Sequence, residues 1–493
     1  MKRMMLLLAL MLTLTASAQK KREFRGAWIQ CVNGQFQGMG TERMQQTLRY
    51  QLDELQKDGV NAIIFQVRPE CDALYASKLE PWSRFLTGQQ GKAPTPYWDP
   101  LQWMIKECHQ RGMELHAWIN PYRAKTKGTT FLAANHITQR KPQNCFDYDG
   151  LTILNPGIPE NRDYICEVAK DIVDRYDIDG IHMDDYFYPY PAPNLLIPDH
   201  VQFNAYGSDF TDINNWRRHN VNLFIEQFYK TVHDTKPWVK VGISPFGIYR
   251  NKKSDPKGSD TNGLQNYDDL YADILLWIDK GWLDYCVPQI YWEIGNKAAD
   301  YQTLIRWWDE NAGGRPLFIG EDIDRTAKFR DAENPGMTQQ EAKHRLYLQT
   351  KNAQGIVLWY AKAAVDNTGN YGSTLRNNYW RTPALQPAMP FIDGKRPGKP
   401  RSVQPVWTED GYFLFWTAPR QKYWGDVVTK YVVYRFRKGE KVNTDDPSHI
   451  VAITSQTFIK LPYDTGEDTY YYVVTSLDRL QNESRISKKK VKL

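Results

Sequence analysis

The stretch of sequence that decides the fold is Ile178-Asp179-Gly180-Ile181-His182-Met183-Asp184-Asp185-Tyr186. The alternation of a β-strand places Gly180, His182 and Asp184 on one face, and the apolar side chains between them face the opposite way. Two adjacent carboxylates directly after an apolar strand are poorly explained by folding alone. The stretch therefore predicts a buried strand whose carboxyl end carries functional groups.

The same alternation of short apolar runs and amphipathic helical segments extends over most of the chain. Several helical segments end at a glycine just before the next run, as in Lys57-Asp58-Gly59. Eight such strands indicate an α/β fold of the (β/α)8 TIM barrel type, and a doubly wound sheet is the weaker alternative because no glycine-rich phosphate loop follows the first run. The predicted strands are residues 26–29, 61–67, 114–119, 178–183, 239–244, 284–291, 316–319 and 355–359, and the predicted helices are 42–57, 100–111, 159–176, 215–235, 267–280, 301–311 and 339–352.

Composition divides the chain into four parts. Residues 1–18 contain a basic start, an apolar run and Ala16-Ser17-Ala18, the pattern of a cleaved signal peptide, so we expect export to the periplasm or the cell exterior. The barrel is predicted over 22–390, and a Pro/Gly/Lys-rich linker over 391–400. Residues 401–493 predict an all-β, fibronectin type III-like sandwich that acts as a spacer or weak binder. Its strand-like runs are 412–416, 430–436, 450–453, 457–461 and 469–476.

Net charge, apolar runs and cysteine spacing argue against a nucleic-acid partner, a membrane span and cysteine-based chemistry. A chain of 493 residues with a formal net charge of +6 is too weakly basic to indicate a nucleic-acid partner. No long apolar run follows residue 18, so we expect no membrane span. The six cysteines lack C-x-x-C spacing and are expected to be small buried residues. No cofactor or metal is expected, and the oligomeric state is not indicated.

Polar side chains also lie at the carboxyl ends of other predicted strands. Barrels of this type have their active sites at that end. The sixth strand places Glu293, a second carboxylate, on the same face as Gln289 and Tyr291. In the second strand Arg68 either binds a substrate hydroxyl or carboxylate, or pairs with Glu70. The other inward residues of the second and third strands are Gln66, His116, Trp118 and Asn120.

Carboxylates across a barrel mouth, surrounded by aromatic and amide side chains, describe a sugar site. Glycoside hydrolysis needs one acid to protonate the leaving oxygen and a second carboxylate as nucleophile or base. Aromatic rings stack on the apolar faces of sugars, so the expected partner is a carbohydrate polymer or oligosaccharide. Tryptophans at or just past predicted strand ends are Trp28, Trp82, Trp118, Trp292 and Trp359.

Three alternatives compete with this interpretation. A metal-dependent hydrolase or deacetylase would use His116, His182, Asp184 and Asp185 as ligands, although the late strands supply no further histidine. A serine hydrolase is disfavoured because Ser244 lacks the G-x-S-x-G elbow. A non-catalytic glycan-binding protein would use the same cleft.

From about Arg22 to Pro390 the sequence resembles the bacterial glycosyl hydrolase-like family 10. The motifs that carry the resemblance include Arg25-Gly26-Ala27-Trp28-Ile29, His116-Ala117-Trp118-Ile119-Asn120-Pro121-Tyr122-Arg123, Asp179-Gly180-Ile181-His182-Met183-Asp184-Asp185-Tyr186, Gly242-Ile243-Ser244-Pro245-Phe246-Gly247 and Pro288-Gln289-Ile290-Tyr291-Trp292. The resemblance implies an exported (β/α)8 glycosidase, often with a C-terminal fibronectin-like module. One relative in Gram-negative bacteria acts on peptide-free peptidoglycan strands, which the resemblance offers as a substrate class.

The resemblance also implies roles for individual residues. Asp184 or its neighbour Asp185 takes the place of the nucleophile, and Glu293 that of the acid/base, which requires a raised pKa. Met183 stands where the family often has Phe, on the outward face, and should not disturb the chemistry. The predicted substrate-binding residues are Trp28, Gln66, Arg68, Glu70, His116, Trp118, Asn120, Tyr122, Arg123, His182, Tyr186, Ser244, Gln289, Tyr291, Trp292 and Trp359.

Overall fold

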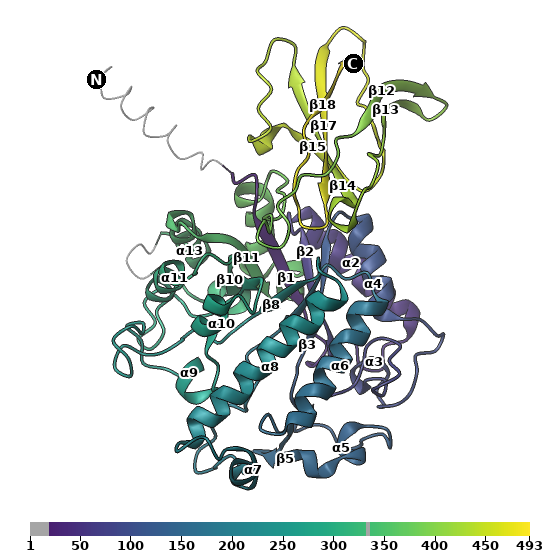
Figure 1. Ribbon diagram of the computed structural model, residues 1–493. Coiled ribbons are helices and arrows are strands. Elements are labelled where there is room, and N and C mark those ends of the chain that lie inside the picture. The colour runs from purple at the N-terminus through teal and green to yellow at the C-terminus, as the bar shows by residue number, and fades with distance from the viewer. Residues whose placement is uncertain (1–18, 332–335) are drawn as a thin grey trace, which may run out of the picture.

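A computed structural model describes residues 19–331 and 336–493, so the predicted signal peptide lies outside the described residues. The described chain contains a closed barrel of eight parallel strands in the order β1-β11-β10-β9-β8-β7-β3-β2, which confirms the predicted fold (Figure 1). The strands are β1 (Phe24–Ile29), β2 (Ala62–Arg68), β3 (Glu114–Ile119), β7 (Gly180–Met183), β8 (Lys240–Ile243), β9 (Tyr285–Cys286), β10 (Leu317–Asp322) and β11 (Ala353–Trp359).

The sixth barrel strand is much shorter than the predicted run 284–291. Pro288 has no N–H to donate, so the ladder breaks there and continues only as isolated bridges from Gln289 to Phe246 and Gly320. The predicted helix 267–280 is also divided, because Tyr271 has a positive φ of 57° that a helix does not accommodate.

Helices surround the barrel, and most agree with the predicted segments to within two residues. Several begin at a side-chain cap, as where Asp99 accepts a hydrogen bond from the Gln102 amide. The main helices are α2 (Thr41–Lys57), α4 (Pro100–Gln110), α6 (Pro159–Arg175), α8 (Ile213–Thr235), α9 (Asn266–Asp269), α10 (Ile274–Lys280), α11 (Tyr301–Glu310) and α13 (Gln339–Gln349). Shorter ones are α3 (Arg84–Thr87), α5 (Ile137–Arg140), α7 (His200–Tyr206), α12 (Ile323–Lys328), α14 (Ala361–Val365) and α15 (Tyr371–Thr374).

An antiparallel sheet that the sequence did not predict is inserted between β3 and β7. It consists of β4 (Arg123–Lys125), β6 (Leu151–Leu154) and β5 (Cys145–Tyr148), in that order. β4 follows closely after β3, so the sheet extends the chain beyond the carboxyl end of that strand.

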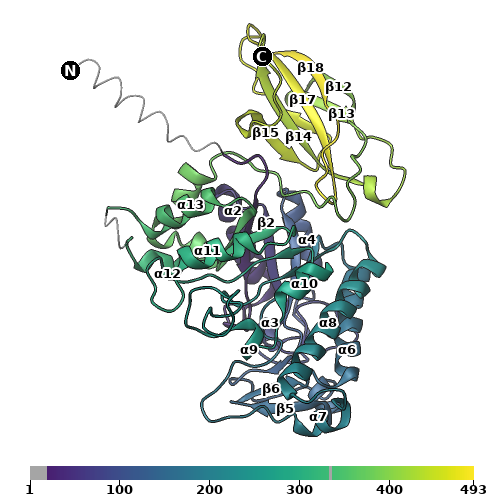
Figure 2. The same ribbon diagram turned by 60° about the vertical axis from the view of Figure 1, so that its left-hand side comes forward.

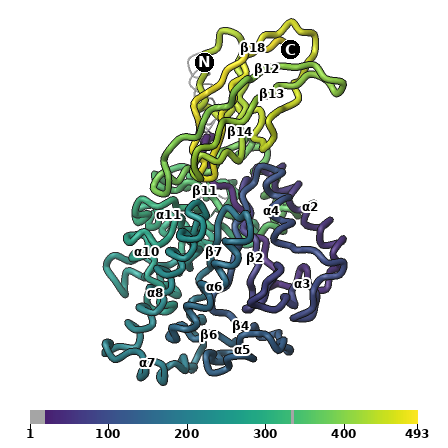
Figure 3. The backbone as a smooth tube through the Cα atoms, turned by 45° about the vertical axis from the view of Figure 1, so that its right-hand side comes forward, coloured from purple at the N-terminus to yellow at the C-terminus, as the bar shows by residue number. Residues whose placement is uncertain are grey.

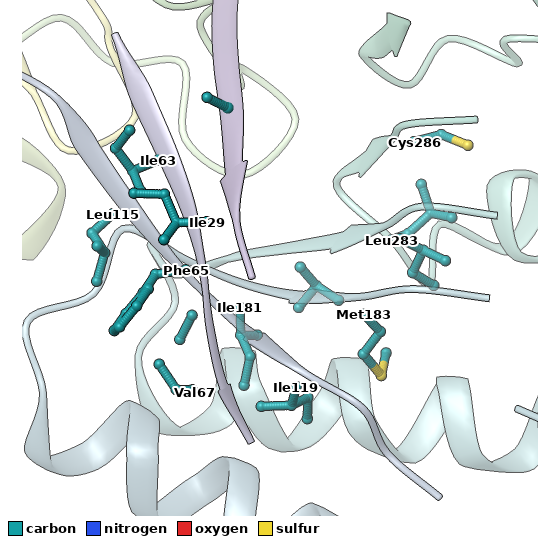
Figure 4. Packing of buried hydrophobic residues seen from close by; sticks show 14 of the residues in the cluster. Ile29, Ile63, Phe65, Val67, Leu115, Ile119, Ile181, Met183, Leu283 and Cys286 are labelled. Atoms are coloured by element: carbon teal, nitrogen blue, oxygen red, sulfur yellow. The ribbon is translucent and has the colours of Figure 1, made fainter. Parts of the chain in front are cut away.

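The barrel has an outer and an inner core. Outward-facing aliphatic side chains such as Ile63, Leu115, Ile181 and Met183 pack in the outer core, as the strand alternation predicts (Figure 4). The inner core is largely aromatic, and its members include Phe24, Trp28, Trp118, Tyr285 and Phe318.

Two strand glycines make room for these interior rings. A Cβ added at Gly242 would lie 1.9 Å from Cζ of Tyr285, and one at Gly180 would lie 2.5 Å from Nδ1 of His116. Neither position therefore tolerates a side chain without displacement of an interior ring.

Residues 401–493, all of which are described, form two packed antiparallel sheets. One is β12 (Arg401–Thr408), β13 (Gly411–Thr417) and β16 (Phe458–Lys460), and the other is β15 (Ile450–Thr454), β14 (Val428–Arg437), β17 (Thr469–Asp478) and β18 (Ser487–Lys492). Leu414 and Trp416 of the first sheet share a core with Tyr431 and Val474 of the second. The all-β character is confirmed, β12 and β18 were not predicted, and the fibronectin type III assignment stays a prediction.

This C-terminal module packs against the N-terminal ends of the barrel strands. Lys430 donates to the carbonyl of Gly112, just before β3, at 3.0 Å, and Arg479 pairs with Asp177, just before β7, at 2.7 Å. The module and the β4–β6 sheet thus lie at opposite ends of the barrel (Figures 1, 2 and 3).

Two expectations from composition can be compared with the structure. All six cysteines lie in the described part and are free, and five of them are buried. Across residues 19–331 and 336–493, no helix is long and apolar enough to span a membrane.

The interior packing predicts a strong effect of Gly242→Ala. The new methyl group must displace Tyr285, so we expect a loss of about 1–3 kcal/mol in the free energy of unfolding. Gly40→Ala is the matched control, because a Cβ there meets no described heavy atom within 4 Å. Urea unfolding measures both, and an equal small effect of the two substitutions would contradict the packing argument.

Candidate active site

A cavity of about 250 Å³ lies at the carboxyl end of the barrel strands. Its walls come from β1, β3 and β11 and from the segments that follow β7, β8 and β9, which is where a closed parallel barrel brings its loops together. The lining residues are Trp28, Trp118, Asp184, Tyr186, Tyr190, Ser244, Phe246, Gln289, Tyr291, Trp292 and Trp359.

Four aromatic rings in mutual contact form one side of this cavity. Trp359 stacks on Tyr291 at a centroid distance of 6.2 Å and meets Trp28 and Trp118 edge-on at 6.1 and 6.2 Å. Rings that pack against one another have little freedom to move, so they offer a preformed apolar surface to a ligand.

Asp184 is the carboxylate that lines the cavity. Its Oδ2 accepts a hydrogen bond from Nε1 of Trp118 at 3.3 Å and another from Nδ2 of Asn120. Oδ1 is buried and has no hydrogen-bond partner within the described residues. Burial raises the pKa of Asp184 to about 6, although the positive charge of Arg123 opposes the rise.

Asp185, the next residue after Asp184, is hydrogen-bonded by a different set of side chains. Tyr190 donates its hydroxyl to Asp185, and Nε2 of Gln289 donates at 3.3 Å. Burial, followed by the charge of Asp184, raises the pKa of Asp185 to about 7. The two neighbouring carboxyl groups therefore face β3 and the end of β9 respectively.

Glu293 has a different environment. Its carboxylate accepts from Nε of Arg325, on α12, at 2.7 Å and from Nδ2 of Asn296 at 2.7 Å. Burial raises the pKa of Glu293, but the hydrogen bonds from Arg325 and Asn296 outweigh it, and the pKa is lowered. The raised pKa that an acid role at Glu293 requires is not found.

Arg68 and Glu70 lie away from the cavity. The pairing in the barrel shifts register between Gln66 and Arg68, and Arg68 is fully buried against Glu80, with Nη2 to Oε1 at 2.6 Å. Arg68 therefore does not pair with Glu70, which was one of the two alternatives predicted for it. Glu70 instead accepts from the amide of Thr126 at 2.6 Å.

Gln66 and Arg123 orient Asn120, which bonds the catalytic candidate Asp184. Nε2 of Gln66 and Nη2 of Arg123 both donate to Oδ1 of Asn120, at 2.7 and 2.6 Å. These bonds fix the side-chain amide of Asn120 so that its Nδ2 points at Asp184. Gln66, Asn120 and Arg123 were predicted to touch substrate, but the cavity is not lined by them.

His116, His182 and Tyr122, which were predicted to bind substrate, are interior residues and do not line the cavity. Nδ1 of both histidines bonds the hydroxyl of Tyr285, at 2.7 and 3.1 Å, inside the barrel. Tyr122 packs on Phe224 in the outer core. Across the described residues, no three His, Cys, Asp or Glu side chains are grouped to hold a metal, so the alternative ligand set is not assembled.

Two lining residues were missed by sequence reasoning. Phe246 lies two positions after Ser244 at the end of β8, so strand alternation was a usable signal. Tyr190 belongs to an irregular loop and is placed by its stacking on Tyr186, at 5.1 Å, for which the sequence carries no signal. Trp82, which was predicted at or just past a strand end, lies in the loop between β2 and α3 and packs on Tyr97 instead.

A (β/α)8 barrel with a buried carboxylate among aromatic rings at its carboxyl end is the arrangement of a barrel glycoside hydrolase. Residues 23–326 match the family described as Glycosyl hydrolase-like 10. The chain belongs to this family, and the protein is a glycoside hydrolase.

Two relatives illustrate how far the similarity extends. The chain is 39% identical over 490 residues to glycosyl hydrolase YngK of Bacillus subtilis (strain 168), which covers 97% of this chain and 95% of the relative. It is 41% identical over 274 residues to glycosyl hydrolase DigH of Escherichia coli (strain K12), which covers 54% of this chain and 62% of the relative.

Solved structures are similar at lower identity. The glycoside hydrolase domain of PgaB (BpsB) from Bordetella bronchiseptica is 11% identical with a TM-score of 0.47, over 72% of this chain and 99% of that one. The catalytic domain of β-amylase from Paenibacillus polymyxa is 13% identical with a TM-score of 0.45, over 73% and 98%.

The raised pKa of Asp185 predicts a pH-dependent gain in stability for Asp185→Asn. An unfolded aspartate has a pKa of about 3.9. The folded protein therefore binds an extra proton between about pH 4 and pH 7, and the wild-type free energy of unfolding falls as the pH rises through that window. Asp185→Asn removes this pH-dependent contribution, so we expect the variant to be stabilised relative to wild type by roughly 2–4 kcal/mol more at pH 8 than at pH 4.

Urea titrations at the two pH values measure this difference. The exposed Asp464→Asn is the control for the loss of one negative charge. A stability difference for Asp185→Asn that does not grow with pH would contradict the prediction.

Proposed function

We propose that the protein is an exported hydrolase that cleaves O-glycosidic bonds of a bacterial glycan, with peptide-free peptidoglycan strands as the substrate class. The observation that carries the proposal is the Asp184 carboxyl group, which is buried in an aromatic cavity and has one oxygen without a partner among the described residues. Export rests on the sequence pattern of residues 1–18, and N-terminal sequencing of the exported protein, expected to begin at Gln19, tests it.

The acid for this reaction is assigned to the Asp184–Asp185 pair. The charge of Asp184 raises the pKa of Asp185, so the two buried carboxyl groups do not ionise independently, and their raised pKa values keep a proton on the pair close to neutral pH. That proton goes to the leaving glycosidic oxygen as its bond to the anomeric carbon breaks, and a water molecule then adds to the anomeric carbon and returns one proton to the aspartate pair. Asp184 is the member that lines the cavity, so it is the group that faces the glycan.

The surroundings of Asp184 support its role. Trp118 and Asn120 both donate to Oδ2, whereas Oδ1 is buried and has no hydrogen-bond partner among the described residues. The donors on Oδ2 stabilise the carboxylate that remains after proton transfer. Glu293, ionised and bonded to Arg325, is not used as the acid.

The aromatic lining supports a carbohydrate substrate. Trp359 and Tyr291 are partly exposed and present rings that can stack on sugar faces, with the buried Trp28 and Trp118 packed against Trp359, while Gln289 and Tyr186 supply hydrogen-bonding groups. The peptidoglycan class comes from the family resemblance.

Asp184→Asn is the decisive substitution. We expect kcat to fall by about 10²–10⁴-fold, because the side-chain amide of asparagine is not acidic enough to give a proton to the leaving oxygen. The thermal unfolding temperature should stay close to that of the wild type. The matched variant Glu293→Gln removes the other predicted carboxylate and should keep kcat within about tenfold of wild type. Loss of turnover in Glu293→Gln with activity retained in Asp184→Asn would reverse the assignment.

Incubation with denuded peptidoglycan strands tests the substrate class. We expect new reducing ends and soluble oligosaccharides by mass spectrometry, with a panel of other polysaccharides as comparison. Binding without new reducing ends would identify a glycan-binding protein, and activity lost to a chelator and restored by metal would identify a metal-dependent enzyme.

A further inference from the structure

A continuous row of hydrogen bonds runs along the axis of the barrel. It begins at Trp28 beside the cavity and ends at Glu114 at the opposite end of the strands. The steps are Trp28 Nε1 to His182 Nε2 (3.4 Å), His182 Nδ1 to Tyr285 Oη (3.1 Å), Tyr285 Oη to His116 Nδ1 (2.7 Å) and His116 Nε2 to Glu114 Oε2 (3.0 Å). We call these five side chains the axial chain, and each is at most 2% exposed.

Only one arrangement of protons satisfies every member of the axial chain. The indole of Trp28 can only donate, so Nε2 of His182 accepts and its Nδ1–H donates to Tyr285. The Tyr285 hydroxyl then donates to Nδ1 of His116, whose Nε2–H donates to the carboxylate of Glu114. Burial lowers the pKa of His182 well below its usual value, in agreement with a neutral ring. The two histidines must therefore be opposite tautomers.

The axial chain is built into the barrel. Barrel interiors of this type are usually filled by branched aliphatic side chains. Here Gly242 and Gly180 leave the space that the rings of Tyr285 and His116 occupy. A polar row in such a place costs free energy unless every group is paired, and in the axial chain each group is paired.

The C-terminal module closes the far end of the axial chain. Gln481, in the turn between β17 and β18, donates from Nε2 to Oε1 of Glu114 at 2.6 Å, and Lys240 donates to the same oxygen at 2.5 Å. The neighbouring Leu480 packs in the inner core of the barrel together with Tyr285 and Phe318. The module thus supplies the last layer of the barrel interior.

We propose that the module is part of the catalytic unit: Gln481, Glu114, His116, Tyr285 and His182 are positioning residues that hold the Trp28 ring in the sugar site. If His182 changed tautomer, two N–H groups would face each other and the buried indole N–H would lose its acceptor. The ring would then leave its place against Trp359 and Tyr291. The inference rests on the proposed sugar-binding role of the cavity.

Tyr285→Phe tests the proposal, because it removes only the hydroxyl that joins the two histidines. We expect KM for a soluble glycan fragment to rise by about 3–10-fold with kcat less affected, since Trp28 supports the Trp359 and Tyr291 rings that bind the sugar and takes no part in proton transfer. Tyr301→Phe is the matched control: its buried hydroxyl bonds Glu321 at 2.6 Å, outside the axial chain, and Glu321 keeps Tyr371 as a partner. Equal kinetic effects of the two variants would overturn the proposal.

Gln481→Leu extends the test to the module. It removes the donor to Glu114 and should raise KM in the same direction as Tyr285→Phe. Arg479→Ala, in the same turn, removes the ion pair with Asp177 and a cation–π contact with Trp238 but no bond to the axial chain, and should leave KM unchanged. No change in Gln481→Leu would exclude the module from the catalytic unit.

Selective ¹⁵N-histidine NMR tests the axial chain without any activity. At neutral pH we expect His182 protonated at Nδ1 and His116 at Nε2, with assignments from single His→Gln variants. The same tautomer at both positions, or a charged ring at either, would overturn the proposal. Should the wild type cleave no glycan, the dissociation constant of a bound fragment replaces KM, so failure of the proposed reaction is distinguishable from failure of the positioning role.

Discussion

Closure of the barrel forces the inward side chains of eight strands into one shared volume, and the rest of the structure depends on how that volume is filled. Large rings occupy it, and Gly180 and Gly242 are the strand positions that yield the space. Rings with polar atoms must be paired when buried, so the filling of the core also dictates a row of hydrogen bonds between Trp28 and Glu114. The packing of the inner core therefore also fixes the position of Trp28, which lines the cavity.

The carboxylates show how environment separates groups of the same chemistry. Asp184 and Asp185 follow an apolar strand and are both buried, and burial favours the protonated form and raises the pKa of each. Glu293 stands beside Arg325, which favours the ionised form. The difference follows from neighbours on other elements, and it reassigns the acid from Glu293 to the aspartate pair in the proposed reaction.

The module and the cavity lie at opposite ends of the barrel, which changes how residues 401–493 are understood. A spacer would need only a small contact, but Leu480 enters the barrel core and Gln481 bonds a buried carboxylate. Lys430 adds a buried ammonium group from β14 near the start of β3. These contacts make the module the closing layer of the barrel at its N-terminal end.

Local periodicity allowed much of the fold to be predicted from the sequence. The strand alternation in 178–186 correctly separated Ile181 and Met183, in the outer core, from His182, inside the barrel. It also brought Trp28, Trp118 and Asp184 to one end of the barrel, because carboxyl ends of parallel strands meet there. The inserted sheet β4–β6 escaped prediction, since its strands are only three or four residues long.

Only the tertiary structure decided how deep each inward side chain lies in the barrel and which side chain it bonds. Alternation gave His116, His182 and Asp184 the same inward direction, yet only Asp184 reaches the cavity, because the histidines lie deeper and bond Tyr285. Arg68 pairs with Glu80 rather than Glu70 because the strand shifts register beside it. The sequence by itself determined which residues face inward, through the period of the strand. Only the folded barrel determined which of them meet, since that depends on contacts between segments far apart in the chain.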